Sequence, residues 1–254
     1  MTRIEKLKYA RRVLLTQDRI ALRYQKIIRK ELTTTAKALS DSYKTNHSDQ
    51  GFNEIIKGHR DRLVVIVDKM SQETADAFKI FTLQSKKNTF ESYIENAIYG
   101  QLIKNSMSTA LAISNNTVAI ASGVIAASMQ ASIKNPDKAL PVNVADAISQ
   151  RIGGVSANAR AMTIARTETH KAANTAQYNR AEWAANDAGL DVEVEWISTN
   201  DGRVRDDHKH ADGQKRDIGQ PFNVGGEMLR YPSDPRGSAA NVINCRCVLA
   251  YDTK

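Results

Sequence analysis

The residues best suited to chemistry lie near the C-terminus of the chain. Cys245 and Cys247 are the only two cysteines and have Arg246 between them, and His208 and Asp212 lie upstream among turn residues. Thiolate, imidazole and carboxylate groups are the ligand set of zinc. His208, Cys245 and Cys247 are therefore candidate metal ligands, and a structural zinc could fold a turn-rich segment that has little apolar core of its own.

The spacing of these residues leaves two other interpretations open. Zinc sites usually have about two to four residues between paired cysteines, and in a strand Cys245 and Cys247 would share one face without good chelating geometry. The two thiols would then be small buried groups beside a hydrogen-bonded histidine. His208, His210 and Asp212 also suit a metal-dependent nuclease or hydrolase, but no nucleophile motif or phosphate-binding glycine loop accompanies them. We therefore predict no catalytic residues.

A second group of polar residues joins a helix to the loops around these candidates. Arg166 and Glu168 are two residues apart on a predicted long helix, so their side chains do not face each other. Each can reach opposite charges in the loops after residue 200, although plain surface charge is the alternative. The predicted pairs are Arg166 with Asp201 or Asp206, and Glu168 with Arg203 or Arg205. With His208 and Asp212, these residues form a predicted network that fixes the loops onto the helix.

The hydrophobic pattern places these groups in a C-terminal module. Helical periodicity is clear in residues 3–38, 54–82, 88–104 and 106–133, and residues 39–53 are polar and predicted to be a connection. After a proline break come predicted helices at 144–152 and 157–187, and predicted strands at 192–198 and 242–251. We therefore predict a mostly α N-terminal region of long helices, residues 1–136. Residues 137–254 should form an α+β module with a long helix, a short antiparallel sheet and turn-rich loops.

The positive charge of the chain is concentrated at its start. The formal net charge is +8, and residues 1–38 hold 11 Lys and Arg against 3 Asp and Glu, so the remainder is neutral. A concentrated basic segment attracts a polyanion or an acidic protein surface, although a solvated helix face is an equal alternative. The candidate DNA- or partner-binding residues are Lys6, Lys8, Arg11, Arg12, Arg19 and Arg23.

Composition excludes several broad classes. A hydrophobic content of 41% and a charged content of 25% are typical of a folded protein and not of a disordered one. The N-terminus has no apolar signal segment, and the weakly polar run at residues 117–129 is too short to span a bilayer, so no membrane contact is predicted. Two cysteines do not make a disulfide framework, which favours a reducing compartment.

Short motifs occur in a fixed order over about residues 140–250. The series consists of Ala165-Arg166-Thr167-Glu168, Glu195-Trp196, Asp201-Gly202-Arg203-Val204-Arg205, His208, Asp212-Gly213, Phe222, Gly225-Gly226, Tyr231-Pro232-Ser233-Asp234-Pro235 and Asn241-Val242-Ile243-Asn244-Cys245-Arg246-Cys247. This series resembles the phage Mu protein F-like minor head protein family, also called phage head morphogenesis proteins. His210 and Ala211 depart from the family pattern, but both lie beside the motif residues and leave the resemblance intact.

The resemblance implies a structural protein of a tailed-phage virion. Such a protein lies inside the head near the portal, after assembly in the host cytoplasm, and affects DNA packaging or ejection. The implied partners are the portal protein, the major capsid or scaffolding protein, and double-stranded DNA. Some family domains are joined to toxin or ADP-ribosyltransferase domains, and with Lys254 as the last residue no such C-terminal addition is expected here. A metal-dependent hydrolase and a plain DNA-binding protein are the alternative functions.

Overall fold

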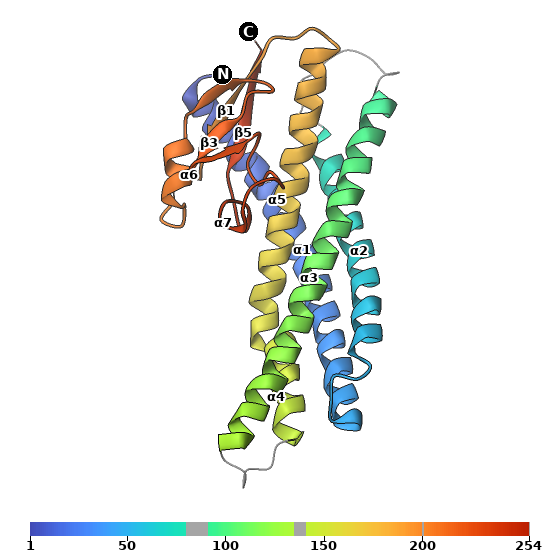
Figure 1. Cartoon of the computed structure of the whole chain (residues 1–254). Coiled ribbons are helices and arrows are strands. Elements are labelled where there is room, and N and C mark those ends of the chain that lie inside the picture. The colour runs from blue at the N-terminus through green and yellow to red at the C-terminus, as the bar shows by residue number, and fades with distance from the viewer. Residues whose placement is uncertain (80–90, 135–140, 200, 254) are drawn as a thin grey trace. The chain divides into compact units, whose positions relative to one another are not determined.

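The computed structural model describes residues 1–79, 91–134, 141–199 and 201–253 (Figure 1). Its long helices are α1 (Arg3–Asn46), α2 (Phe52–Ala77), α3 (Glu91–Lys134), α4 (Pro141–Gly153) and α5 (Val155–Asn186). The elements that follow are β1 (Val192–Ile197), α6 (Asp206–Ala211), β2 (Lys215–Asp217), β3 (Phe222–Val224), β4 (Glu227–Leu229), α7 (Ala239–Val242) and β5 (Val248–Thr253). The predicted fold class is confirmed: long helices come first, and a long helix with a small antiparallel sheet follows.

The chain forms two compact units, and each is assembled from separate stretches of sequence. Unit 1 combines Met1–Leu22, Lys69–Asn105 and Arg166–Lys254, and unit 2 combines Arg23–Asp68 and Ser106–Ala165. The predicted boundary at residue 136 and the predicted helix end at residues 80–82 lie outside the described residues. The candidate metal ligands and the first turns of α1 both belong to unit 1.

α1 begins with a capping box and is longer than predicted. The backbone N–H of Glu5 donates to Thr2 Oγ1 at 3.3 Å, and the backbone N–H of Thr2 donates to the Glu5 carboxylate at 2.7 Å. The predicted connection at residues 39–53 is wrong for its first half, because the helix continues to Asn46. Leu39 and Tyr43 are buried and extend the apolar face of the helix through the polar stretch.

The helical core of unit 2 contains a close contact between α4 and α1 and a buried carboxylate. Ile148 and its neighbours on α4 pack against apolar residues of α1, α2 and α3. A Cβ on Gly153 would lie 2.8 Å from the Cβ of Ala36, so only glycine fits between α4 and α1 without a shift. The buried carboxylate of Glu31 accepts a hydrogen bond from Arg62 Nε at 3.0 Å, which compensates for its burial.

α3 replaces two predicted helices. The patterns at residues 88–104 and 106–133 are joined in one continuous helix, Glu91–Lys134. Its segment Ile94–Ala131 has a mean hydropathy of 1.5 and is long and apolar enough to cross a membrane by length and composition alone. Core helices of soluble proteins pass the same test, so the expected absence of a membrane partner stays a prediction.

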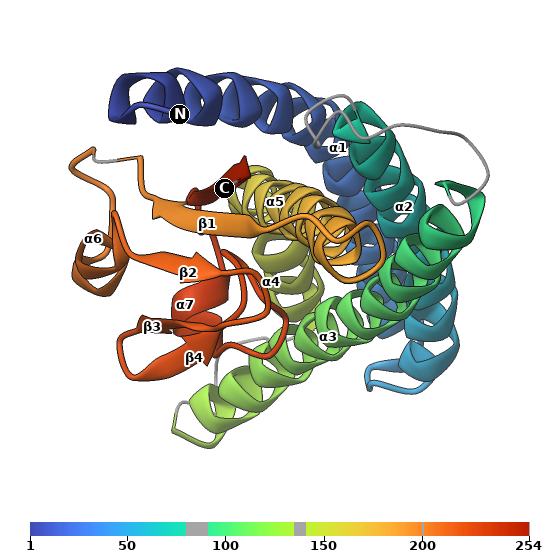
Figure 2. The same cartoon turned by 90° about the horizontal axis from the view of Figure 1, so that it is seen from above.

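β1, the central strand of the three-stranded sheet in unit 1, is buried on both faces. The strand order of this sheet is β2-β1-β5, both pairings are antiparallel, and Trp196 of β1 lies opposite Leu249 of β5. Val194 and Trp196 point into a core shared with α5 and the β3–β4 hairpin, while Ile197 and Val248 pack with Tyr9 and other residues of α1. Figure 2 shows the first turns of α1 running alongside β1. Because successive side chains of β1 point to opposite faces, this strand contributes to two hydrophobic cores.

The predicted strand at residues 242–251 is wrong for its first half. Strand β5 begins only at Val248, and Val242 ends the short helix α7. Asn244 has a φ of 57°, a left-handed conformation that interrupts an extended chain, and Cys245 N–H donates to the carbonyl of Val242 at 3.3 Å. Cys245 and Cys247 therefore lie in a turn before the strand, where their sulfurs are not held to the geometry of a strand face.

Candidate functional site

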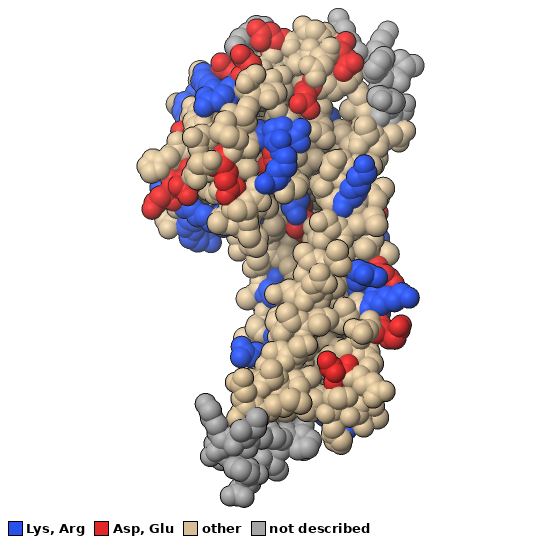
Figure 3. Space-filling view, viewed as in Figure 1, with Lys and Arg blue, Asp and Glu red and all other residues tan. Residues whose placement is uncertain are grey.

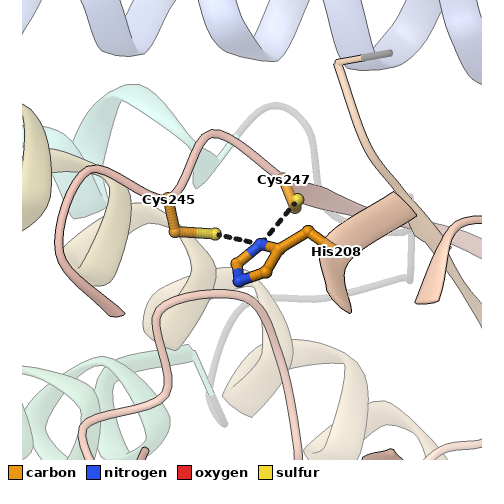
Figure 4. Close-up of side chains that lie close together, drawn as sticks. All are labelled: His208, Cys245 and Cys247. Carbon is orange, nitrogen blue, oxygen red and sulfur yellow. Dashed lines mark hydrogen bonds between the residues drawn. The ribbon is translucent and has the colours of Figure 1, made fainter. Parts of the chain in front are cut away.

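α6 and the turn before β5 bring the three candidate metal ligands together. Nδ1 of His208 lies 3.3 Å from Sγ of Cys247 and 3.6 Å from Sγ of Cys245 (Figure 4). All three side chains are buried, and their possible ligand atoms lie within 4.8 Å of one another. We call these three residues the His–Cys cluster. Its thiols and imidazole can hold a soft or borderline metal ion.

Asn241 determines which ring nitrogen of His208 faces the sulfurs as an acceptor. The side-chain amide nitrogen of Asn241 donates to the carbonyl of Val224 at 3.3 Å, so its Oδ1 is left to face Nε2 of His208, also at 3.3 Å. Oδ1 can only accept, and Nε2 must therefore carry the proton of a neutral ring. The lone pair of Nδ1 then points at the two cysteines.

The two cysteines of the His–Cys cluster have thiol pKa values that are shifted in opposite directions. A hydrogen bond from Cys247 lowers the pKa of Cys245 below the usual thiol range, and His208 adds to this effect. The same hydrogen bond and burial raise the pKa of Cys247 above that range. One of the two cysteines therefore loses its proton more readily than the other. A cation that bound both sulfurs would have to displace the second proton.

A cavity of about 220 Å³ adjoins the His–Cys cluster and is rich in arginine. Its lining consists of the three cluster residues together with Arg166, Thr199, Arg203, Val204, Arg205, Asn244 and Arg246. Four of the lining residues are arginines, which give this cavity a positive character. The cavity also gives small ions and water a route to the buried cluster.

Asp201 is the acidic centre of the loop network. It accepts two hydrogen bonds from Arg246, each at 2.7 Å, and two from Arg203, from the backbone N–H at 3.0 Å and from the guanidinium at 3.2 Å. The Arg246 guanidinium is the main reason why the pKa of Asp201 lies well below its usual range. Arg205 donates to the backbone carbonyl of Ile243. The network thus ties the loop after β1 to the turn that carries the cysteines.

The predicted pairs of the helix residues differ from the observed ones. Arg166 lies 3.8 Å from Asp18 of α1, and Glu168 pairs with Lys171 at 2.8 Å on its own helix. The pairing of Glu168 with Lys171 follows from their spacing, since residues three apart on a helix are neighbours, and Asp201 pairs with Arg246. The loops are held to α5 by Thr167 instead, whose Oγ1 accepts the Asn244 N–H at 3.0 Å.

Comparison with known proteins identifies the family of this region. The family model described as phage Mu protein F like protein matches residues 112–250, more than half of the chain. The chain belongs to this family. Membership confirms the resemblance seen in the motifs and points to a phage head morphogenesis protein of the virion.

A curated relative has an enzymatic name but shares only one segment with the chain. It is the NAD(+)--arginine ADP-ribosyltransferase EFV of Enterococcus faecalis (strain ATCC 700802 / V583), 30% identical over 88 residues. The matched segment is 35% of this chain and 18% of that protein, so the chain spans less than a fifth of the relative's length. A search of solved structures found no match.

In this phage Mu protein F like protein, the residues of the hydrolase alternative do not converge. His208 is buried, whereas His210, two residues further along α6, is exposed. Asp212 accepts from the backbone N–H of Ser198 at 2.7 Å and from Arg3 at 2.6 Å. Its carboxylate therefore holds the end of β1 and the start of α1, and the combination of His208, His210 and Asp212 is not assembled as a catalytic site.

The candidate DNA-binding residues of the family member separate into one buried and five exposed side chains. Lys8, Arg11, Arg12, Arg19 and Arg23 are exposed on α1. On the face seen in Figure 3, by comparison, Lys and Arg are interspersed with Asp and Glu. These five residues give α1 a positively charged side that faces solvent. We call them the basic outer face.

Lys6 is a correction to the predicted binding set. Its side chain is only 4% exposed, and its ammonium lies 2.8 Å from Glu195 and 2.7 Å from Asp252. Arg3 adds a contact to Glu195 at 2.6 Å. The physical reason is that the sheet offers two carboxylates at the start of α1, so Lys6 neutralises buried acid and does not face solvent. We call Arg3, Lys6, Glu195 and Asp252 the inner charge cluster.

Sequence reasoning missed three residues that shape the site. Arg246 stands in the sequence between the two cysteines, and its pairing with Asp201 depends on a loop 45 residues away. Asn241 belongs to the motif series but had no predicted role, because an asparagine before a turn is common. His170 of α5 is fully buried, and neither ring nitrogen has a hydrogen-bond partner among the described groups. Burial and the charges of Arg166 and Arg246 lower the pKa of His170 to about 3.

Proposed function

We propose that this chain is a minor head protein that acts beside the portal and contacts DNA or a portal surface through α1. Family membership supports the role in the head. The observation that carries the contact is the basic outer face of α1, whose five members are among the exposed Lys and Arg side chains of this helix. Phosphate groups bind such a face with little regard to base sequence.

Apolar side chains within the same face favour an additional protein contact. Leu15 and Leu22 are 57% and 53% exposed and lie between the basic residues of α1. Exposed leucines contribute nothing to phosphate binding, but they bury apolar area against a protein. An acidic and partly apolar surface of a portal or capsid protein therefore fits this helix, and packaged DNA fits its charges.

The test compares two variants of equal charge change. In the first, Lys8, Arg11, Arg12 and Arg19 become Gln; in the second, the exposed residues Lys57, Lys69, Lys104 and Arg151 become Gln. We expect only the first to weaken double-stranded DNA binding at low salt. It should also reduce the slope of log affinity against log salt, by about 0.9 for each phosphate that the helix no longer neutralises.

Co-assembly with the portal tests the rest of the proposal. The full chain, expressed with its cognate portal protein, should co-purify with the portal ring, and the first variant should be depleted from it. Equal DNA affinity of both variants, together with absence from portal rings, would contradict the proposed role of α1.

We propose that the chain itself is not an enzyme. The ADP-ribosyltransferase name belongs to a protein of which this chain covers 18%, which fits a head-protein segment joined to a separate domain in that relative. Incubation with NAD⁺ and an arginine-rich acceptor should release no nicotinamide above the level of a buffer control. Nicotinamide release by the chain after its purification to a single species would overturn this proposal.

A further inference from the structure

We propose that His208, Cys245 and Cys247 bind one Zn²⁺ ion, with a water molecule from the arginine-lined cavity as fourth ligand. The ion would connect α6 with the turn before β5. The inference concerns the internal stability of unit 1, and it holds or fails independently of the proposed role in the phage head.

The distances in the His–Cys cluster match the edges of a zinc tetrahedron. Zinc lies about 2.3 Å from a thiolate sulfur and about 2.0 Å from an imidazole nitrogen, which places nitrogen and sulfur about 3.5 Å apart. The two observed separations between Nδ1 of His208 and the sulfurs are 3.3 Å and 3.6 Å. An ion can therefore be placed among the three atoms with little rearrangement of the backbone.

The partner of His208 provides a second, independent observation. Histidines that bind metals almost always donate their other ring N–H to a fixed oxygen, which orients the ring and selects its tautomer. Oδ1 of Asn241 fills this position at 3.3 Å from Nε2, and the contact between Asn241 and Val224 prevents the amide from turning over. The ring is thus held in the one tautomer whose Nδ1 can bind an ion.

The charges around the cluster are compatible with a divalent cation. Zn²⁺ with two thiolates and a neutral imidazole has no net charge, so its burial costs little. Arg246 has its charge balanced by Asp201 at 2.7 Å, and it lies close enough to Cys247 for their charges to interact. Among the described residues, the cluster contains no fourth His, Cys, Asp or Glu, and the adjoining cavity is the source of the remaining ligand.

The local structure indicates what the ion would stabilise. α6 has six residues and no side-chain cap at its N-terminus, and the cysteines lie in a turn. Cys245 is 37 residues from His208 in sequence. A metal bridge across this distance would fix both segments against Trp196, whose ring meets the imidazole edge-on with centroids 6.0 Å apart.

The experiment uses the full chain, purified under reducing conditions from zinc-supplemented cells. We expect about one zinc per chain by elemental analysis, as for other sites of this ligand type. After exchange with Co²⁺, we expect the visible bands of a tetrahedral site and a thiolate-to-cobalt charge-transfer band. Removal of the ion with a chelator should lower Tm.

Variants locate the ion and control for misfolding. Cys247→Ser should abolish stoichiometric binding, and Asn241→Ala, which leaves all three ligands in place, should weaken zinc affinity by about 10–100-fold. His210→Asn, on the exposed side of α6, should bind as the wild type does. A wild-type protein that holds no zinc and gives no thiolate–cobalt band overturns the proposal whatever the variants do, and so does full zinc binding by Cys247→Ser.

Discussion

Arg3 and Lys6 of the inner charge cluster lie on the same helix as the basic outer face, but only these two pair with carboxylates of the sheet. Lys6 is buried between Glu195 and Asp252, whereas Lys8, two residues later, is exposed. The two lysines are indistinguishable by residue type, and only the carboxylates of the sheet separate them. The comparison teaches that a run of positive charge has no single role: its inner members pair with carboxylates of the sheet, and its outer members are exposed to solvent.

The most stringent test of this comparison removes the charge of each lysine in turn. Lys6→Met should lower the free energy of unfolding by about 3 kcal/mol, because it leaves Glu195 and Asp252 with one cation fewer in a buried setting. Lys8→Met is the matched control and should change stability by less than about 0.5 kcal/mol. Chemical denaturation of both variants makes the measurement, and equal losses would show that the two faces are not distinct.

The buried imidazole of His170 extends the comparison, because it has no acidic partner among the residues that the structure describes. Desolvation, with the charges of Arg166 and Arg246, lowers the pKa of His170 to about 3, whereas an unfolded histidine has a pKa near 6.5. As the pH falls below about 6.5, His170 therefore binds a proton in the unfolded state but not in the folded state. This contribution is complete above about pH 6.5 and is lost as the pH falls toward 3, with about 2 kcal/mol lost between pH 7 and pH 5.

His170→Asn isolates that contribution. The variant should lose less stability than the wild type between pH 7 and pH 5, since every other titrating group is common to both proteins. Denaturant unfolding at the two pH values gives the difference directly. Parallel losses in wild type and variant would mean that His170 is protonated in the folded protein.

The smallest expected effect concerns the start of the helix that carries both faces. Thr2→Ala removes one member of the capping box with Glu5 and should cost about 1 kcal/mol, whereas Thr2→Ser keeps the hydroxyl and should cost little. Because Arg3 and Lys6 of the inner charge cluster lie in the first two turns, fraying should also weaken their ion pairs. Amide hydrogen exchange in the first turns of α1 should increase for Thr2→Ala alone.

Local patterns predicted the elements of the fold better than the contacts between them. The alternation in residues 192–198 was sufficient for β1, and helical periodicity was sufficient for the long helices. The extension of α1 to Asn46 was missed because polar residues surround Leu39 and Tyr43, whose burial depends on other helices. The start of β5 was missed because the left-handed Asn244 leaves no mark in the hydrophobic pattern.

The candidate site was predictable where ligand chemistry is specific and unpredictable where geometry decides. Thiols and imidazole suggested that His208 and the two cysteines belong together, and the structure places them in one cluster. Their fixed tautomer could not be foreseen, because it depends on Asn241 and on the carbonyl that orients it. The burial of Lys6 was equally hidden, since Glu195 is 189 residues away in the sequence.

The discontinuous make-up of unit 1 has a consequence for the time at which it can fold. Val13 of α1 packs with Val248 and Ala250 of the last strand, so this core is incomplete until β5 has been synthesised. At about 5–20 residues per second, a ribosome needs roughly 10–40 s to reach that strand after it has passed the end of α1. During this interval the inner side of α1 exposes its apolar residues and Lys6 to the cell. Contacts of such long sequence separation also form slowly, so unit 1 closes only after translation of its last strand.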